Sequence, residues 1–325
     1  MAAFTTPSTV AQTTDAMFSG YLDPTLAQDY FAEVEKVSIV QQIARKIPMG
    51  PTGVRIPHWT GDVTAKWVGE GEQKPVTKGD MTKQDVVPHK IATIFAASSE
   101  VVRANPMNYL NTMRVKVAEA IAMAFDHAVL HGINSPFGAS ISDTTKSVNL
   151  GPNGYDALNE GLELLLEDGK KWNGTLFDNI AEPVLNKSKD AADRPLFLEA
   201  TYQDINAPFR SGRVLGRPTY LSDHITDGNG LLGFQGDFSQ VVWGQIGGLS
   251  YDVSDQATLD LSAAGDGSGI VSLWQNNLVA IRVEAEFGVL VNDPEAFVKL
   301  TGGVAVPLKK DEAPKAAAAP KTAAK

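Results

Sequence analysis

Two histidines near the end of a long helical segment are the first candidates for chemistry in this sequence. His127 and His131 are four residues apart, a spacing that lets two imidazoles on one helix face share a metal ion. In the H-E-x-x-H motif a glutamate follows the first histidine, and here Ala128 takes that position. We therefore interpret the pair as ordinary helix-end histidines near the negative end of the helix dipole. The sequence predicts no metal site.

The other patterns that could carry chemistry are incomplete. The glycine-rich run 265–269 matches neither the dinucleotide fingerprint nor the P-loop, which closes on Gly-Lys-Ser/Thr. No segment has the G-x-S-x-G nucleophile pattern, and no carboxylate pair stands out from the many acidic residues. The chain has no cysteine, which excludes disulfides and thiolate chemistry. We predict no catalytic, cofactor-binding or metal-binding residues and a protein that is not an enzyme.

Composition places the chain among ordinary globular proteins. Its 325 residues are 43% hydrophobic and 20% charged, enough for a sizeable core in two domains or one extended domain. The formal charge of -10 argues against a protein whose main function is to bind nucleic acid tightly, because nucleic-acid-binding surfaces need clustered Lys and Arg. The sequence contains no secretory signal and no apolar run of about 18 residues. We predict a protein made in the cytosol with no membrane contact.

One long helix must position much of the remaining chain. Asn105 suits an N-cap, Pro106 the first helical position and Gly132 the residue after the end, so we predict a helix over 106–131. Apolar residues cover two of its faces, so the helix is expected to lie between two layers. Its predicted core residues are Leu110, Met113, Val117, Ile121 and Phe125. Its predicted polar stripe consists of Thr112, Lys116, Glu119 and Asp126.

The segment 48–88 has a different pattern. Short alternating runs on either side of the turn residues 60–62 predict a hairpin. Beyond Trp67, about 20 residues offer almost nothing to bury, and an isolated two-stranded ribbon is marginally stable in water. Either this ribbon rests on another subunit, with Trp59 and Trp67 as aromatic anchors, or it folds back on its own domain. Both readings remain open at this point.

The second half of the chain predicts a unit of mixed α and β structure. Asn153 can cap a helix that Gly169 closes, and Leu158, Leu162, Leu165 and Leu166 share one face of it. Strands are expected near 214–221 and after 236–240. Residues 279–287 alternate apolar and charged side chains, which predicts a strand with one buried face. We expect this strand to return to the long helix, so that the first domain is discontinuous in sequence.

Several short segments carry a family resemblance through their order and spacing. They are Ala65–Gly71, Ser98–Val102, Leu215–Pro218 with Ser222-Asp223, Gly236–Ser239, Asn276–Arg282 with Phe287–Val289, and Pro294–Phe297. Together they resemble the major capsid proteins of tailed bacteriophages with the HK97 fold, particularly those of phages infecting actinobacteria. The resemblance spans about residues 20–305.

The resemblance implies an α+β, HK97-like capsid fold with an N-terminal arm, an extended E-loop hairpin, a peripheral domain with a long spine helix, and an axial domain. The implied ranges are 1–47 for the arm, 48–88 for the E-loop, 89–150 for the peripheral domain with its spine helix at 106–131, 151–275 for the axial domain, 276–308 for the peripheral return strands, and 309–325 for a disordered Ala/Pro/Lys tail.

The resemblance also implies a function and partners. The chain would self-assemble into pentamers and hexamers of an icosahedral shell that encloses double-stranded phage DNA without sequence-specific binding. The expected E-loop contacts to a neighbouring subunit are Trp59, Trp67, Glu70 and Lys74, with Trp67 as the first choice of anchor. Only a short arm precedes the shared region, so the scaffolding protein is expected to be separate. A portal is a further partner, and the shell leaves room for a decoration protein.

The implied location is the virion capsid, assembled in the host cytoplasm. Two alternatives are retained. One is an encapsulin-like nanocompartment with the same fold, which a cargo-enzyme gene next to the shell gene would favour. The other is a soluble two-domain hydrolase whose carboxylates converge in a cleft, which a monomer or small oligomer in negative-stain images would favour.

Overall fold

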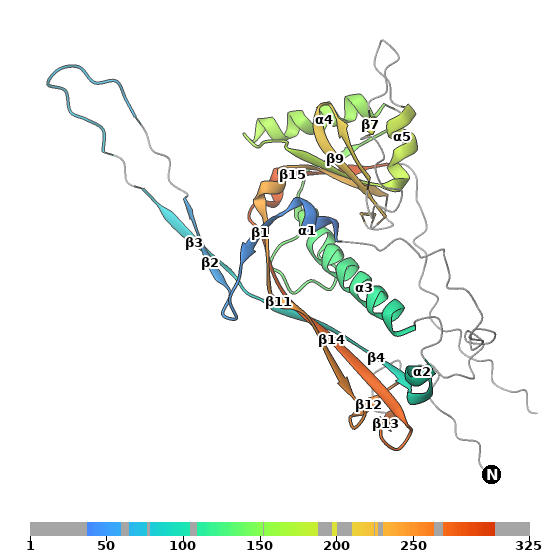
Figure 1. Cartoon of the computed structure of the whole chain (residues 1–325). Coiled ribbons are helices and arrows are strands. Elements are labelled where there is room, and N and C mark those ends of the chain that lie inside the picture. The colour runs from blue at the N-terminus through green and yellow to red at the C-terminus, as the bar shows by residue number, and fades with distance from the viewer. Residues whose placement is uncertain are drawn as a thin grey trace, which may run out of the picture. The chain divides into compact units, whose positions relative to one another are not determined.

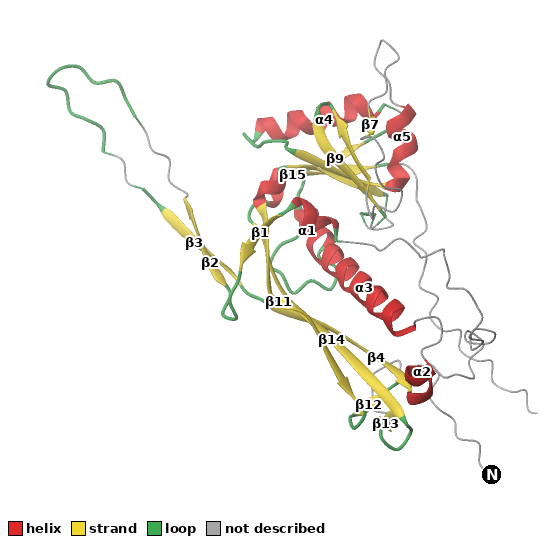
Figure 2. Cartoon of the chain, viewed as in Figure 1, coloured by secondary structure: helices red, strands yellow, loops and turns green. Residues whose placement is uncertain are grey.

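The computed structural model describes residues 38–59, 65–76, 79–104, 109–151, 153–187, 197–199, 210–223, 225–226, 230–262 and 269–302. Helices and strands are mixed along the chain (Figures 1 and 2). The described part divides into two compact units: unit 1 comprises residues 38–140 and 238–293, and unit 2 comprises residues 141–237 and 294–302. None of the described helices is long and apolar enough to span a membrane. The predicted arm before residue 38 and the predicted tail lie outside the described residues.

A four-stranded sheet in the order β1-β11-β14-β4 forms the frame of unit 1. Its strands are β1 (Arg45–Pro48), β11 (Val241–Ser254), β14 (Leu278–Val291) and β4 (His89–Ser98). Strand β14 is antiparallel to both β11 and β4, whereas β1 is parallel to β11. The pairing of β4 with β14 runs from Ser98 opposite Leu278 to His89 opposite Phe287. Unit 1 is therefore discontinuous in sequence, which confirms the expected return of the late strand.

The long helix α3 (Tyr109–His131) packs on one face of this sheet (Figure 1). Val117, Ile121 and Phe125, three of the predicted core residues, are buried there, and Met113 is half-buried. The Phe125 ring lies 4.9 Å from the ring of Phe287 on β14, which is one of the alternating residues that point toward the helix. The side chain of Leu110 and the predicted helix start at residues 105–108 lie outside the described residues.

Smaller elements complete unit 1. Helix α2 (Ser99–Ala104) follows β4 directly, and helix α1 (Ile39–Ile43) contacts α3. A two-stranded sheet of β12 (Thr258–Asp260) and β13 (Ile270–Ser272) packs its apolar residues against one end of β14 and β4. The 3-10 turn η5 (Phe238–Gln240) leads into β11. Strands β2 (Val54–Trp59) and β3 (Met81–Val86) form a separate antiparallel ribbon.

Unit 2 contains a seven-stranded sheet in the order β5-β15-β10-β6-β9-β8-β7. Its strands are β5 (Ser147–Asn149), β6 (Gly174–Asp178), β7 (Phe197–Glu199), β8 (Arg210–Val214), β9 (Arg217–Ser222), β10 (Leu231–Gly236) and β15 (Phe297–Thr301). Three 3-10 turns, η3 (Ile141–Asp143), η4 (Asn179–Ala181) and η6 (Pro294–Ala296), and helix α5 (Glu182–Lys187) connect them. The sheet is mixed, since β6 runs parallel to β9 but antiparallel to β10.

Helix α4 (Gly154–Glu167) packs on this sheet as its sequence predicts. The Asn153 side chain accepts a hydrogen bond from the backbone N–H of Tyr155, and Gly169 has the positive φ of 66° expected after a helix end. Leu158 and Leu165 are fully buried. Leu166 was predicted to share their face, but it is 61% exposed because its direction falls at the solvent edge of the helix.

The domain boundaries differ from those predicted. The predicted ranges are 151–275 for one domain and 276–308 for the return strands of the other. In the structure, unit 2 starts at residue 141, is interrupted after Asp237 and continues from Pro294. The reason is strand pairing between distant segments. Strand β11 pairs with β14 from Val241 opposite Val291 to Ser254 opposite Ala280, so it belongs to unit 1. Strand β15 lies between β5 and β10 and belongs to unit 2.

Candidate assembly interface

The ribbon of β2 and β3 is built from the two alternating runs that the sequence predicts. Its register places Val54 opposite Val86 and Trp59 opposite Met81. Arg55 Nε and Asp85 Oδ1 are 2.5 Å apart across the two strands. This hydrogen-bonded pair lowers the pKa of Asp85 and raises that of Arg55. Because both side chains are exposed to water, the pair contributes little to stability.

Among the described residues, only the base of the ribbon packs against the rest of unit 1. Val86 is buried, while the other side chains described for β3 are exposed or half-buried. A Cβ on Gly288 of β14 would lie 3.0 Å from Val86 Cγ1 and 2.4 Å from Met49 Cε, so strand and ribbon base touch closely at this glycine. Gly53 turns the chain into β2 with a φ of 81°, and a Cβ there would meet the Val86 carbonyl oxygen at 2.2 Å. The ribbon is anchored at one end.

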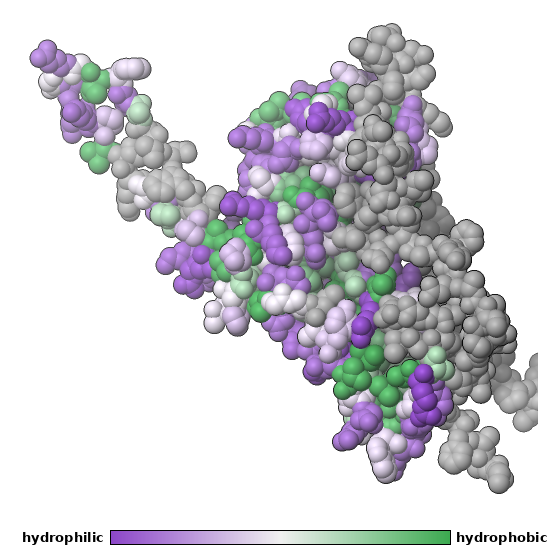
Figure 3. All heavy atoms as spheres, in the orientation of Figure 1, coloured by the Kyte–Doolittle hydropathy of each residue, from purple (hydrophilic) through white to green (hydrophobic). Residues whose placement is uncertain are grey.

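The loop at the other end of the ribbon is exposed to water throughout its described residues 65–76. Trp67 is fully exposed (103%), and Val76 is 94% exposed. Glu72 accepts a hydrogen bond from the backbone N–H of Gly69, which shapes the turn but covers no apolar surface. Figure 3 shows this loop as mostly hydrophilic with a few hydrophobic side chains. The loop thus presents apolar side chains that nothing among the described residues covers.

The structure describes the side chains of three of the four predicted contact residues of the ribbon. Trp67, Glu70 and Lys74 all lie in the exposed loop, close together in sequence. Trp59 ends strand β2, and its side chain lies outside the described residues. The contact of these residues with a neighbouring subunit stays a prediction.

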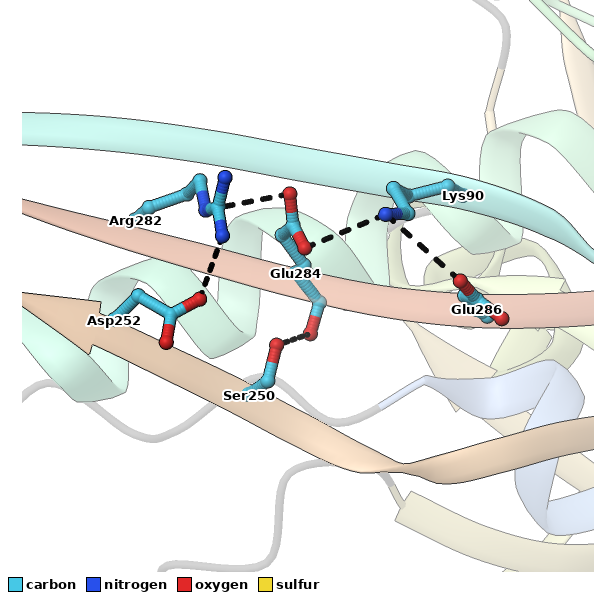
Figure 4. Close-up of polar contacts among 6 residues, drawn as sticks. All are labelled: Lys90, Ser250, Asp252, Arg282, Glu284 and Glu286. Atoms are coloured by element: carbon cyan, nitrogen blue, oxygen red, sulfur yellow. Dashed lines mark hydrogen bonds and ion pairs between the residues drawn. The ribbon is translucent and has the colours of Figure 1, made fainter.

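A row of charged side chains crosses the other face of the unit 1 sheet (Figure 4). Arg282 of β14 bridges Asp252 Oδ2 of β11 at 2.7 Å and Glu284 Oε1 at 3.4 Å. Lys90 of β4 bridges Glu284 Oε2 at 3.5 Å and Glu286 Oε1 at 3.9 Å. Arg282, Glu284 and Glu286 are the charged residues of the alternating strand β14, and they lie on the face opposite Phe287.

The ion pairs of this charged row link strands β4, β11 and β14 on a face of the sheet that has no hydrophobic core among the described residues. The Ser250 hydroxyl of β11 also donates a hydrogen bond of 3.4 Å to the backbone carbonyl of Glu284. The hydrogen bond to Asp252 raises the pKa of Arg282, which stays charged. Three carboxylates and two cations leave an excess of one negative charge on this face. A face of this kind is suited to water or to a polar partner.

Asp126 has a structural role that its place in the predicted polar stripe does not reveal. It was predicted in a polar stripe of the long helix, but it is fully buried against helix α1. Its carboxylate accepts hydrogen bonds from the Ser38 hydroxyl at 2.6 Å and from the backbone N–H groups of Ile39 at 3.0 Å and Val40 at 3.2 Å. Burial raises the pKa of Asp126 to about 6, although these hydrogen bonds act in the opposite direction.

The contact between Asp126 and Ser38 fixes the start of the described chain to the long helix. The two residues are 88 positions apart, so no local pattern could reveal the pairing. Glu119, another member of the predicted polar stripe, is also buried, and Lys116 Nζ lies 3.3 Å from its carboxylate. Both acidic residues of the predicted polar stripe are therefore buried, because α3 buries polar side chains that have partners.

The histidine pair has the geometry of two neighbouring rings. The rings of His127 and His131 are 5.7 Å apart in an edge-to-face arrangement, and burial lowers the pKa of His127. Among the described residues, no group of three or more His, Asp or Glu side chains could hold a metal ion.

Comparison with solved structures shows which fold the chain has. A chain from Gordonia phage Cozz superposes with a TM-score of 0.67 at 23% identity, covering 89% of this chain and 94% of that one. A chain from Mycobacterium phage Adephagia superposes with a TM-score of 0.68 at 20% identity, covering 88% of this chain and 96% of that one. The fold is the HK97-like fold of phage capsids.

Sequence comparison gives the family. The model of the phage capsid family matches residues 20–302, and the probable major capsid protein gp17 of Mycobacterium phage L5 is 60% identical over 303 residues, which cover 90% of this chain and 92% of that protein. The chain belongs to the phage capsid family. It is a shell-forming major capsid protein of a tailed phage and not an enzyme. Neither the encapsulin-like compartment nor the hydrolase is favoured.

Proposed function

We propose that the chain closes its shell as pentamers and hexamers in which the β2–β3 ribbon of one copy, acting as the E-loop, rests on a neighbouring copy. Unit 1 then serves as the peripheral domain, and unit 2 serves as the axial domain that meets its copies around the centre of each capsomer. The shell encloses double-stranded DNA, and a separate scaffolding protein and a portal take part in its assembly in the host cytoplasm.

The observation that carries this proposal is the full exposure of Trp67 on a ribbon with no core of its own. A tryptophan buries on the order of 200 Å² in an interface, and at about 25 cal/mol per Å² this is a gross gain of roughly 5 kcal/mol. Part of that gain is offset by the cost of ordering the loop. An exposed aromatic side chain of this size is typical of a residue that becomes buried when a protein–protein interface forms.

Repetition converts such modest contacts into a stable shell. Each copy gives one ribbon and receives another, so every contact recurs around a closed ring and then over the lattice. Once one contact forms, the next forms at a high effective concentration, and the combined affinity exceeds that of any single pair. This mechanism needs no catalytic residue, in agreement with the family.

The test is assembly of ribbon variants. Trp67→Ala is expected to lower the yield of closed shells at least about tenfold, because roughly 1.4 kcal/mol lost per contact already gives that factor. Trp67→Phe should retain part of the yield. Gln73→Ala, an exposed polar change in the same loop, serves as the matched control and should assemble normally.

Sedimentation and negative-stain microscopy measure the outcome. Normal shells from Trp67→Ala would contradict the role of the ribbon as an assembly element. Loss of shells with Gln73→Ala as well would show that the loop is sensitive to any change, and Trp67 would lose its place as the anchor.

A further inference from the structure

A hollow of about 480 Å³ lies in unit 1 beside the second half of helix α3. It lies between α3, the start of β4, β14 and the loop that follows α3. Apolar side chains form most of its lining: Ile91, Ala124, Phe125, Ile133, Phe137 and Phe287. Pockets of about 300 to 1,000 Å³ with such a lining are typical of ligand-binding sites, and a hollow of this size has room for a large side chain.

The walls of this hollow are preformed. The Phe137 ring lies 6.4 Å from the Phe125 ring and 5.8 Å from the His89 ring, edge to face in both cases. These contacts fix Phe137 between the helix and β4. Ala124 is exposed and Ile133 is 47% exposed at the mouth, so the hollow opens to water. Small alanines on this face of α3 leave room where larger side chains would fill it.

We propose that this hollow receives the Trp67 side chain of a second copy of the chain. The inference rests on the proposed function and names the surface that the ribbon finds on its neighbour. The ribbon brings a fully exposed indole, and the hollow offers an aromatic-lined receptor that no described residue fills. Giving and receiving surfaces are both parts of unit 1, so one kind of contact can repeat around a ring.

Charge distinguishes this hollow from another on the same strand. The lining beside α3 contains no acidic side chain, whereas Glu70 follows Trp67 three residues later in the loop. The second hollow, of about 360 Å³, borders Ile94 and includes Asp260 in its lining. A loop that carries Glu70 next to its anchor would meet like charge there. The first hollow is the better electrostatic match.

The polar rim of the hollow can also satisfy the indole. A buried tryptophan N–H needs a hydrogen-bond acceptor. His127 and Asn134 both line the hollow. Since burial favours the neutral form of His127, its unprotonated ring nitrogen can accept a hydrogen bond, and the side-chain oxygen of Asn134 can do so as well. The receptor thus offers apolar walls and a polar partner for the one donor of the ring.

The natural absence of cysteine makes a direct test possible. Copies that carry Val68→Cys, which keeps the neighbouring Trp67, are mixed with copies that carry Ile133→Cys, assembled, oxidised and run on a non-reducing gel. The expected result is a dimer band that a reductant removes. In the matched control, Ile94→Cys at the second hollow replaces Ile133→Cys, and no dimer band is expected. Shells that form with a link between positions 68 and 94, or with no link, would overturn the proposal.

A second variant keeps Trp67 intact and fills its receptor. Ala124→Phe is expected to lower the yield of shells about as much as Trp67→Ala, with an unchanged free energy of unfolding. Ala120→Phe is the matched control, since Ala120 is exposed on the same helix and does not line the hollow. If Trp67→Ala blocks assembly while Ala124→Phe does not, the ribbon acts in assembly but this hollow is not its receptor. If neither blocks assembly, the proposed function fails as well.

Discussion

At the scale of single residues, Asp126 decides how the N-terminal part of the described chain joins the long helix. Its carboxylate accepts hydrogen bonds from the Ser38 hydroxyl and from two backbone N–H groups at the start of α1, in place of water. These groups would otherwise be unsatisfied donors at a helix end. The pKa of Asp126 is affected by no charged neighbour, only by burial and these hydrogen bonds. One buried carboxyl group therefore anchors one segment to another.

The raised pKa of Asp126 predicts a pH dependence of stability. Because the folded-state pKa of about 6 lies above the ordinary value, the folded state binds this proton more tightly than the unfolded state. The contribution is fully present below about pH 4 and is lost as the pH rises through about 6. Two pKa units correspond to about 3 kcal/mol. Asp126→Asn cannot ionise and lacks this dependence.

The measurement is chemical denaturation of the unassembled chain at several pH values. The stability advantage of the wild type over Asp126→Asn should shrink by about 3 kcal/mol between pH 4 and pH 7. Taking the difference between the two proteins removes the contributions of the other carboxyl groups. An advantage that grows with pH would show that the hydrogen bonds outweigh burial and that the carboxylate form is the preferred one.

At the scale of elements, the ribbon depends on the tight turn at its base. Gly53 combines a φ of 81° with a close approach to the Val86 carbonyl oxygen, so a side chain at this position meets both backbone strain and a clash. Gly71 in the loop has the same φ of 81°, but a Cβ there would meet nothing within 4 Å. The two glycines therefore separate the cost of the backbone angle from the cost of the clash.

Gly53→Ala is predicted to disturb the base of the ribbon and lower shell yield more than Gly71→Ala. The positive φ alone costs about 1 to 2 kcal/mol in both variants, and only Gly53→Ala adds the displacement of β3. Thermal unfolding measures the destabilisation, and sedimentation measures the shells. Equal effects of the two variants would mean that the close approach to Val86 does not hold the ribbon.

The long elements could be predicted from the sequence because their signals are local. Residues 106–131 carry a helical period and a closing glycine, and α3 ends at His131 as expected. Residues 279–287 alternate, and β14 buries Val283, Ala285 and Phe287. The hydrophobic period and the helix caps depend on residues only a few positions apart, so they can be predicted from the sequence alone.

The remaining features depend on contacts between distant segments. Asp126 and Glu119 follow the polar period of the helix. Only the fold shows that the Ser38 hydroxyl and the backbone at the start of α1 cover Asp126. The boundary expected near residue 275 failed for the same reason, since β11 belongs to unit 1 only through its ladder with β14. The hollow beside α3 was not foreseen, because it combines residues from a helix, two strands and a loop.

At the scale of the whole molecule, net charge affects what the shell can enclose. The formal charge of -10 per copy repels the phosphate backbone, although the Ala/Pro/Lys segment 309–325 has a local excess of Lys over acidic residues. A container that bound its contents tightly would hinder both filling and emptying. Weak interaction with DNA is therefore compatible with the function of the shell.

We predict that isolated capsomers do not retain DNA fragments at about 0.15 M salt, because too few cations are available to release the counterions of DNA. Electrophoretic mobility of a labelled duplex checks this outcome, with a basic DNA-binding protein as the positive control. Retention that weakens steeply with added salt would show a cationic surface on the assembled ring and would contradict the charge argument.

Hydrogen exchange of the ribbon tests the central claim most directly. The account predicts that backbone amides in 54–59 and 81–86 exchange quickly in the unassembled chain and at least about tenfold more slowly in closed shells, because a neighbouring copy then covers them. Amides in the buried strand β6 of unit 2 serve as an internal reference and should be protected in both states. A monomer at high concentration whose ribbon is already as protected as it is in the shell would contradict the account.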